Sequence, residues 1–126
     1  MRAILDTSVL LAAAAPRLTG DLAISAASVA ELHFGVLIAR DPAVRAERLR
    51  RLSLIERAFD ALPIDDSVAR SYGQLAATIA QRGRRPRGRV MDLVIAATAH
   101  AHHARLYTSN AGDVAGLQDL LEIVSV

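Results

Sequence analysis

Short apolar, β-prone runs alternate along this chain with longer segments in which apolar residues recur at helical spacing. The runs that we expect to form strands are residues 3–5, 22–25, 62–64, 106–108 and 123–126. Strands separated by helical segments cannot pair as tight hairpins, so they favour a parallel sheet covered by helices. The pattern therefore predicts an α/β fold.

The helical segments differ in how much of their surface is apolar. Residues 46–61 and 67–81 each carry one apolar stripe, which predicts surface-covering amphipathic helices. The stripes consist of Leu49, Leu52, Ile55 and Phe59 in the first segment and of Val68, Tyr72, Leu75 and Ile79 in the second. Residues 91–101 are apolar on nearly all sides, which predicts a helix buried against the sheet. SVLLAAAA, after Asp6, predicts a further helix, and residues 16–21 and 82–89 predict loops from their Pro and Gly content.

Length and composition limit the possible classes of protein. A chain of 126 residues predicts a single domain, residues 1–126, with one core. It contains no Cys, which excludes a disulfide framework, a thiolate nucleophile and Cys-bound zinc. All 15 basic residues are Arg, which excludes a P-loop lysine and a Schiff-base lysine. The formal net charge of +2 is mild, so any attraction to nucleic acid must come from local clustering.

The chain shows no signature of a membrane protein. No uncharged stretch approaches the roughly 18 apolar residues of a membrane span. The first sixteen residues resemble a signal peptide, but Asp6 falls inside the apolar run, where an ionised carboxylate is poorly tolerated. We therefore expect a cytoplasmic protein with no membrane partner.

Four carboxylates fall at junctions between the expected strands and helices. Three of them, Asp6, Glu31 and Asp113, come after strands, and Asp92 opens the buried helix. In an open parallel sheet such junctions meet at the carboxyl edge, where ligands bind. Each acid also has a structural explanation. Asp6 and Asp113 could be N-caps, the sequence SVAE could be a capping box, and Asp92 could favour the positive end of a helix dipole.

Electrostatic repulsion separates these two interpretations. Two carboxylates about 4 Å apart repel by roughly 4 kcal/mol at an effective dielectric near 20, whereas a cap stabilises by about 1 kcal/mol. Four acids in one place are tolerable if some are protonated or, more simply, if a divalent cation lies among them. Oxygen ligands without Cys favour Mg²⁺ or Mn²⁺, and such a centre supports phosphoryl transfer.

The sequences around the four acids resemble, in order, the motifs of PIN-domain ribonucleases, and most closely those of the VapC toxins. These sequences are ILDTSVL, SVAEL, MDLVIAATA, and YTSN followed by Asp113. The resemblance covers essentially the whole chain. It implies a Rossmann-like, three-layer α/β/α domain with a mainly parallel sheet of about five strands. It also implies an endoribonuclease dependent on Mg²⁺ or Mn²⁺, a homodimer, and a cognate VapB-type antitoxin that blocks the site.

The resemblance further assigns roles to individual residues. The implied catalytic residues are Asp6, Glu31, Asp92 and Asp113. All except Glu31 are implied metal ligands, and Glu31 would complete the acidic site and orient the attacking water. The residues implied to hydrogen-bond these carboxylates are Thr7, Ser8, Thr108 and Asn110. Ser109 and Val114 stand where members of the family often have an Arg and a Phe, so one expected RNA contact is missing.

The sequence RGRRPRGR places five arginines directly before the buried helix. We expect the RNA backbone that leads to the acids to be bound through its phosphates by Arg84, Arg85, Arg87 and Arg89. A solvated basic turn and an antitoxin contact are the alternatives.

The histidines give a weaker signal. His100, His102 and His103 do not share one helix face, so we expect no metal site there. We expect His33 to lie in the core or at an interface.

The sequence also allows a second function. A catalytically weak or inactive member of the same fold would use the arginine loop and an apolar face to bind RNA or a partner. The two possibilities differ in whether the protein binds a divalent cation.

Overall fold

The computed structural model describes residues 1–12 and 18–126, except for the side chain of Arg87. In these residues, five parallel strands form one sheet in the order β3-β2-β1-β4-β5. The strands are β1 (Arg2–Leu5), β2 (Asp21–Ser25), β3 (Asp60–Leu62), β4 (Arg105–Thr108) and β5 (Ile123–Ser125). The parallel α/β sheet expected from the sequence is confirmed.

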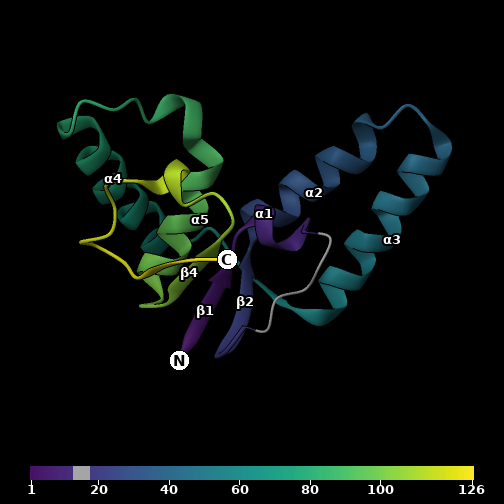
Figure 1. Ribbon diagram of the computed structural model, residues 1–126, viewed down its shortest axis with the longest axis horizontal. Helices are drawn as coiled ribbons and strands as arrows, with labels where there is room; N and C mark the ends of the chain where they lie inside the picture. Colours follow the sequence, from purple (N-terminus) through teal and green to yellow (C-terminus); the bar gives the residue numbers. More distant parts are fainter. Residues whose placement is uncertain (13–17) are drawn as a thin grey trace.

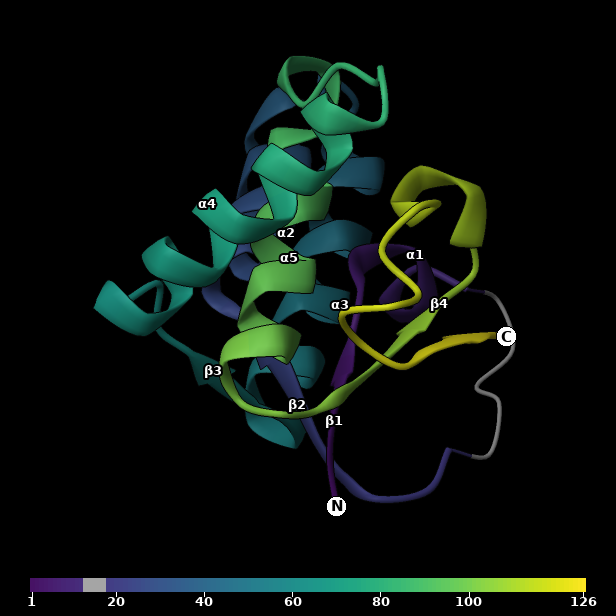
Figure 2. The ribbon, with the colours of Figure 1, turned by 90° about the vertical axis from the view of Figure 1, so that its left-hand side faces the viewer.

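Helices cover both faces of this sheet. They are α1 (Thr7–Leu10), α2 (Ala26–Ile38), α3 (Pro42–Ala58), α4 (Asp66–Gln81) and α5 (Val90–Ala101), with short 3-10 helices η1 (Arg87–Arg89) and η2 (Ala111–Val114). Figure 1 shows α2 and α3 as a hairpin that stands on the opposite side of the molecule from α4 and α5. Turned by 90°, α4 and α5 lie in front of α2 and α3 (Figure 2). The predicted three-layer architecture is therefore confirmed.

The side chains of the central strand β1 point alternately to the two faces of the sheet, which explains the three layers. Ile4 packs into a core with α4 and α5, whereas its neighbours Ala3 and Leu5 pack into a second core with α1, α2 and α3. All three side chains are buried, because successive residues of a strand point to opposite faces of the sheet. The helix α5 contributes more buried residues to the first core than any other element, and it is buried from Leu93 to Ala99 except at Val94, as its apolar sequence predicts.

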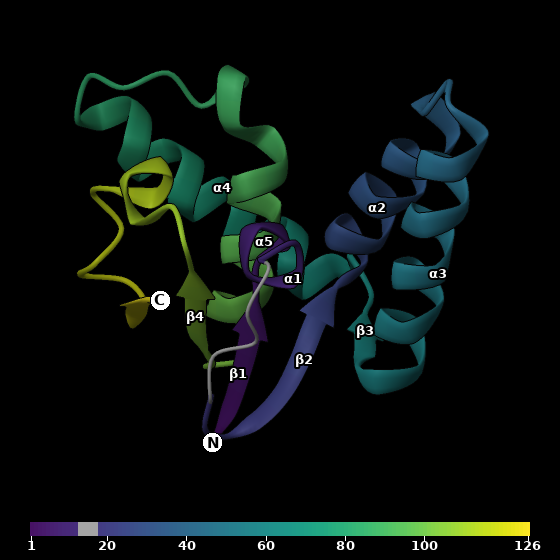
Figure 3. The ribbon, with the colours of Figure 1, turned by 45° about the vertical axis from the view of Figure 1, so that its right-hand side comes forward.

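Register places the ends of three strands together. Leu5 of β1 lies beside Ile24 of β2 and Tyr107 of β4. Figure 3 shows these three strands pointing in the same direction, toward α1. The residues that follow each strand therefore meet at one edge of the sheet, which is where a parallel α/β sheet binds ligands.

Several predicted boundaries are wrong. The helix α3 begins at Pro42 rather than at residue 46, because Asp41 caps it by accepting a hydrogen bond from the Ala43 N–H at 2.9 Å. Leu49, expected on the buried stripe, is 50% exposed. The strand β3 ends at Leu62, two residues before the predicted end.

The helix expected after Asp6 is short. It ends at Leu10, and residues 13–15 of the predicted helix lie outside the described residues, as do residues 16 and 17 of the predicted loop. Across residues 1–12 and 18–126, no helix is long and apolar enough to cross a membrane.

Candidate active site

Asp6 follows the central strand and is held there by the neighbouring strand β4 and by α1. Its backbone N–H donates to the carbonyl of Tyr107 at 3.0 Å, and its Oδ1 accepts from the Val9 N–H at 3.3 Å, so Asp6 is the N-cap of α1. The Ser8 hydroxyl also donates to Oδ1, and Ser8 Oγ accepts from the Ser109 N–H at 3.0 Å. Ser8 thus connects the end of β4 to the Asp6 carboxylate.

Glu31 lies in the second turn of α2 and is held by α1. Thr7 Oγ1 donates to Glu31 Oε1 at 2.6 Å and lies 3.0 Å from the hydroxyl of Ser28, which is fully buried. The cap of α2 is Ser25, whose Oγ accepts from the Ala27 N–H at 3.0 Å. Ser28 is therefore inside the helix, and the capping-box explanation of Glu31 is wrong.

Asp92 lies in the first turn of α5, and its surroundings disfavour ionisation of its carboxyl. Burial raises the pKa of the Asp92 carboxyl, and the negative charges of Asp113, Glu31 and Asp6 raise this pKa further. The guanidinium of Arg89 opposes the shift. The fold therefore brings the other three predicted acids close enough to Asp92 for their charges to raise its pKa.

Asp113 lies within η2, so it is not an N-cap as the alternative interpretation proposed. The guanidinium of Arg89 attaches this segment to the start of α5: its Nη1 lies 3.2 Å from the carbonyl oxygen of Gly112 and 2.9 Å from that of Asp113. We expected Arg89 to contact RNA. Its guanidinium instead donates hydrogen bonds to the protein backbone, at a position between Asp92 and Asp113.

Two other predicted residues bond to each other rather than to the acids. The buried Thr108 Oγ1 accepts from the Asn110 N–H at 3.0 Å, and neither side chain donates to a carboxylate of the described residues. Val114, where a Phe is common in the family, is buried in the core beside α5. The side chain of Arg87 lies outside what the structure describes.

Two of the four histidines contact a neighbouring helix rather than one of the four acids. His33 is exposed, so it is not a core residue, and its Nε2 lies 3.3 Å from Glu56 Oε1 across the α2–α3 hairpin. His100 Nδ1 lies 2.8 Å from the hydroxyl of Ser71 and connects α5 to α4.

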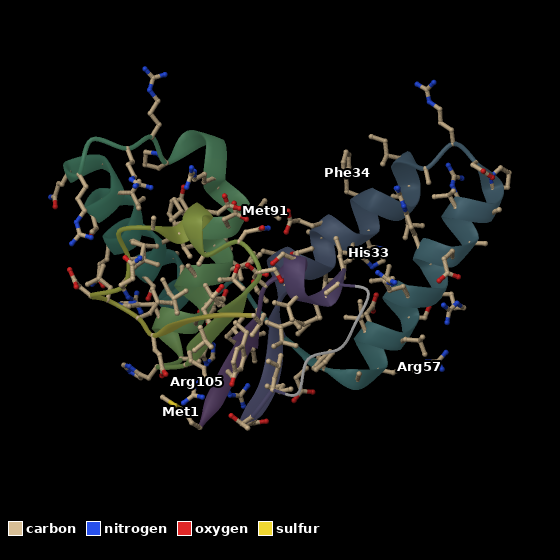
Figure 4. The ribbon with its side chains drawn as sticks, viewed as in Figure 1. Met1, His33, Phe34, Arg57, Met91 and Arg105 are labelled. Carbon is tan, nitrogen blue, oxygen red and sulfur yellow. The ribbon has the colours of Figure 1, made fainter. Side chains whose placement is uncertain are left out.

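An apolar groove of about 650 Å³ opens beside the acids, between α1, α2, α3 and α5. Its lining includes Thr7, Leu11, Glu31, Phe34, Arg48, Arg51 and Met91. Figure 4 shows Phe34 on α2 and Met91 near the start of α5. The sequence pattern did not indicate this groove, because it depends on how far the α2–α3 hairpin stands from α5.

The donor chemistry of the site fits a divalent cation, although the described residues do not form a closed ligand set. No group of three or more His, Cys, Asp or Glu side chains among them stands close enough to hold a metal ion. The oxygens Oδ2 of Asp6 and Oε2 of Glu31 accept no hydrogen bond within this part of the chain. Free carboxylate oxygens that repel one another around Asp92 are suited to Mg²⁺ or Mn²⁺.

Comparison with known proteins agrees with this arrangement. The family model for the PIN domain matches residues 3–112. This chain belongs to the PIN domain family. Within this family it is similar to "Ribonuclease VapC5" of Mycobacterium tuberculosis, with 37% identity over 102 residues that cover 76% of this chain and 73% of that protein. It is also similar to "Ribonuclease VapC4" of the same organism, with 33% identity over 131 residues that cover 99% of this chain and 97% of that protein.

A solved structure extends the similarity to the whole fold. The toxin–antitoxin complex VapBC-5 from Mycobacterium tuberculosis contains a chain that is 36% identical, with a TM-score of 0.87, covering 99% of this chain and 98% of that one. The PIN domain described here is therefore of the VapC type, as the four sequence motifs indicate.

Proposed function

We propose that this PIN domain is an endoribonuclease that requires Mg²⁺ or Mn²⁺, and that it is the toxin of a VapBC pair. The observation that carries the proposal is the raised pKa of Asp92, caused by burial and by three neighbouring carboxylates. A protein gains nothing structurally from such repulsion, whereas a bound divalent cation relieves it. The ribonuclease names of the relatives support RNA as the substrate.

In this proposal Asp6, Asp92 and Asp113 hold the cation. When bound, it supplies positive charge beside the scissile phosphate and activates a water molecule. Glu31 orients this water and accepts its proton through Oε2, because Thr7 already occupies Oε1. The water oxygen bonds to phosphorus, the phosphorus–oxygen ester bond breaks, and the leaving oxygen takes up a proton from solvent.

The direct test is cleavage of total RNA by the purified protein with Mg²⁺ or Mn²⁺. We expect Asp6→Asn and Asp92→Asn to reduce cleavage at least 100-fold and a chelator to abolish it. Asp66→Asn is the matched control, since Asp66 also lies in the first turn of a helix but on α4. Cleavage that continues in chelator, or in Asp92→Asn at the wild-type rate, contradicts the proposal.

One observation favours a second function, a PIN-fold module that binds RNA or a partner without cleaving. Within residues 1–12 and 18–126, no three His, Cys, Asp or Glu side chains stand close enough together to hold a metal ion. Thermal unfolding during a metal titration separates the two functions. A functional site at a metal concentration 100 times its Kd stabilises the fold by about 2.7 kcal/mol. A melting temperature that does not respond to metal, together with RNA binding, favours the module.

We also propose that the apolar groove beside the acids binds the VapB-type antitoxin. Its lining combines apolar side chains with two arginines, which suits a segment containing both apolar and acidic residues. The solved relative VapBC-5 is itself a toxin–antitoxin pair. We expect Phe34→Ser to prevent co-purification with an antitoxin encoded beside this gene, and Ile64→Ser, equally apolar and 53% exposed, to leave it intact. Equal retention by both variants contradicts this assignment.

Homodimerisation and a cytoplasmic location complete the proposal. Apolar side chains remain exposed on the α2–α3 hairpin, among them Leu37, Ile38, Leu49 and Leu54. Such a surface favours a second copy of the chain. We expect a dimer in sedimentation velocity at micromolar concentration, and a monomer at this concentration contradicts the expectation.

A further inference from the structure

The arginine loop between α4 and α5 is anchored at both ends, and Arg84 and Arg85 are exposed between these anchors. The Arg82 guanidinium donates to a backbone carbonyl and a carboxylate that follow η2, and that of Arg89 donates to two carbonyls of η2. Between these anchors, the exposed side chains of Arg84 and Arg85 make no hydrogen bond or ion pair with any described residue. Two guanidinium groups are therefore held near the acids with their donors available.

A cavity of about 340 Å³ lies beneath these two arginines. Its lining consists of Ile79, Arg84, Arg85, Arg89, Leu93 and Asp113. The side chains of Ile79 and Leu93 are almost completely buried members of the first core, so the floor of the cavity is apolar. Because Asp113 also belongs to the four acids, the cavity borders the candidate active site.

We infer that this cavity is a subsite for one nucleotide of single-stranded RNA next to the scissile phosphate. The inference rests on the proposed function, because it takes the four acids as the place of cleavage. Arg84 and Arg85 bind the backbone phosphate of that nucleotide, and its ribose and base lie on the apolar floor. The volume is at the small end of ligand cavities, which suits a single nucleotide and excludes a duplex.

The position of the two arginines favours RNA over an acidic antitoxin segment. A polyanion that reaches four carboxylates is repelled by them, and cations on its path must compensate. The two free arginines lie at the entrance to the acids, on the side of α5 that carries η2 rather than beside the apolar groove. Phosphate contacts position a strand without reading its sequence, so the subsite acts equally on all bases.

The test measures RNA binding separately from cleavage. Fluorescence anisotropy in chelator follows binding of fluorescein-labelled octamers of uridylate and of adenylate at several salt concentrations. The variant Arg84→Gln/Arg85→Gln is compared with Arg57→Gln/Arg70→Gln, which has the same net charge but removes arginines from α3 and α4. Figure 4 shows Arg57 near the end of α3, on the side of the molecule opposite α4 and α5, and Arg57 does not line the cavity.

We expect the first variant to raise the Kd about tenfold for both octamers. The slope of log K against log salt should fall in magnitude by about 0.7, the value for one phosphate contact on a single strand. The control should change the Kd less than twofold. Equal weakening by both variants means that only net charge matters and overturns the inference. It is also overturned by unchanged binding in the first variant, or by wild-type protein that does not bind at 50 mM salt. Loss of antitoxin binding with RNA affinity retained identifies the loop as a protein contact instead and likewise overturns it.

A parallel cleavage assay with Mg²⁺ keeps the two proposals distinguishable. Wild-type protein that binds the octamers through Arg84 and Arg85 but cleaves no RNA leaves the subsite in place and refutes the nuclease. Wild-type protein that cleaves RNA while the Arg84→Gln/Arg85→Gln variant binds normally refutes only the subsite. Both substituted side chains are exposed and unbonded, so melting temperatures within about 2 °C of wild type establish that the variants fold.

Discussion

The contact between Thr7 and Glu31 connects the stability of the fold to the order of the candidate site. Thr7→Val keeps the shape of the side chain and removes its hydroxyl. Glu31 Oε1 then loses a donor at 2.6 Å, and the fully buried Ser28 hydroxyl loses a partner at 3.0 Å. The variant therefore leaves a carboxylate unrestrained and one polar group without a partner.

The expected loss of stability follows from these two bonds. A hydrogen bond to a charged group contributes about 1.5–3 kcal/mol when buried, and Thr7 and Glu31 are only partly buried. We therefore expect a net cost of about 1.5 kcal/mol. For a chain of 126 residues this lowers the melting temperature by about 6 °C.

Thermal and urea unfolding of a double-mutant cycle measure this cost. The cycle combines Thr7→Val with Glu31→Ala, and we expect a coupling free energy of about 1 kcal/mol. Thr78→Val is the matched control, because the hydroxyl of Thr78 bonds only to the Gln74 carbonyl one turn earlier in α4, and we expect it to cost under about 0.5 kcal/mol. A coupling near zero, or a Thr7→Val protein that melts within 1 °C of wild type, refutes the reasoning.

Three further substitutions test other parts of the site and fold. Because the pKa of Asp92 is raised in the folded state, wild-type protein loses stability as pH rises through that pKa. Asp92→Asn in chelator should therefore melt a few degrees higher at pH 7, and the gain should disappear toward about pH 4; a lower melting temperature at pH 7 is evidence against this. Ser8→Ala should reduce RNA cleavage about 10- to 100-fold by releasing Asp6, with a small change in melting temperature, and unaltered turnover refutes the positioning role. Gly20→Ala should destabilise the fold by about 2 kcal/mol in urea unfolding, because φ is +109° and the added Cβ would lie 2.6 Å from the Met1 carbonyl oxygen; a neutral result is inconsistent with this strain.

Local sequence was sufficient for most of the elements. The alternating burial of residues 3–5 and the apolar surface of α5 are visible in the order of side chains, since a strand repeats every two residues and a helix every 3.6. The start of α3 at Pro42 is also encoded locally, because Asp41 followed by Pro42 is a helix start signal. Exposure of Leu49 was not predictable in this way, because it depends on how the hairpin packs against its neighbours.

The capping-box alternative for Glu31 is wrong for a different physical reason. Ser25 and Ser28 both precede Glu31 at positions where a serine can cap a helix. Pairing of Ser25 with Leu62 makes it the last residue of β2, and α2 therefore begins directly after it. Long-range pairing of strands decided which serine caps the helix.

The sequence by itself determined the parallel α/β architecture and the four acids that the fold brings together. Both follow from local periodicity and from the position of each acid after a strand or at a helix start, because parallel strands end at one edge of a sheet. Only the tertiary structure decided how these acids are held: Thr7 bonds Glu31, Ser8 joins the Asp6 carboxylate to the Ser109 N–H, and Arg89 ties η2 to the start of α5. These contacts join residues far apart in the chain, so no local pattern encodes them. The same packing bonds Arg89 to backbone carbonyls, whereas Arg84 and Arg85 line a cavity and make no hydrogen bond with any described residue. The sequence of the loop does not distinguish these arginines from one another.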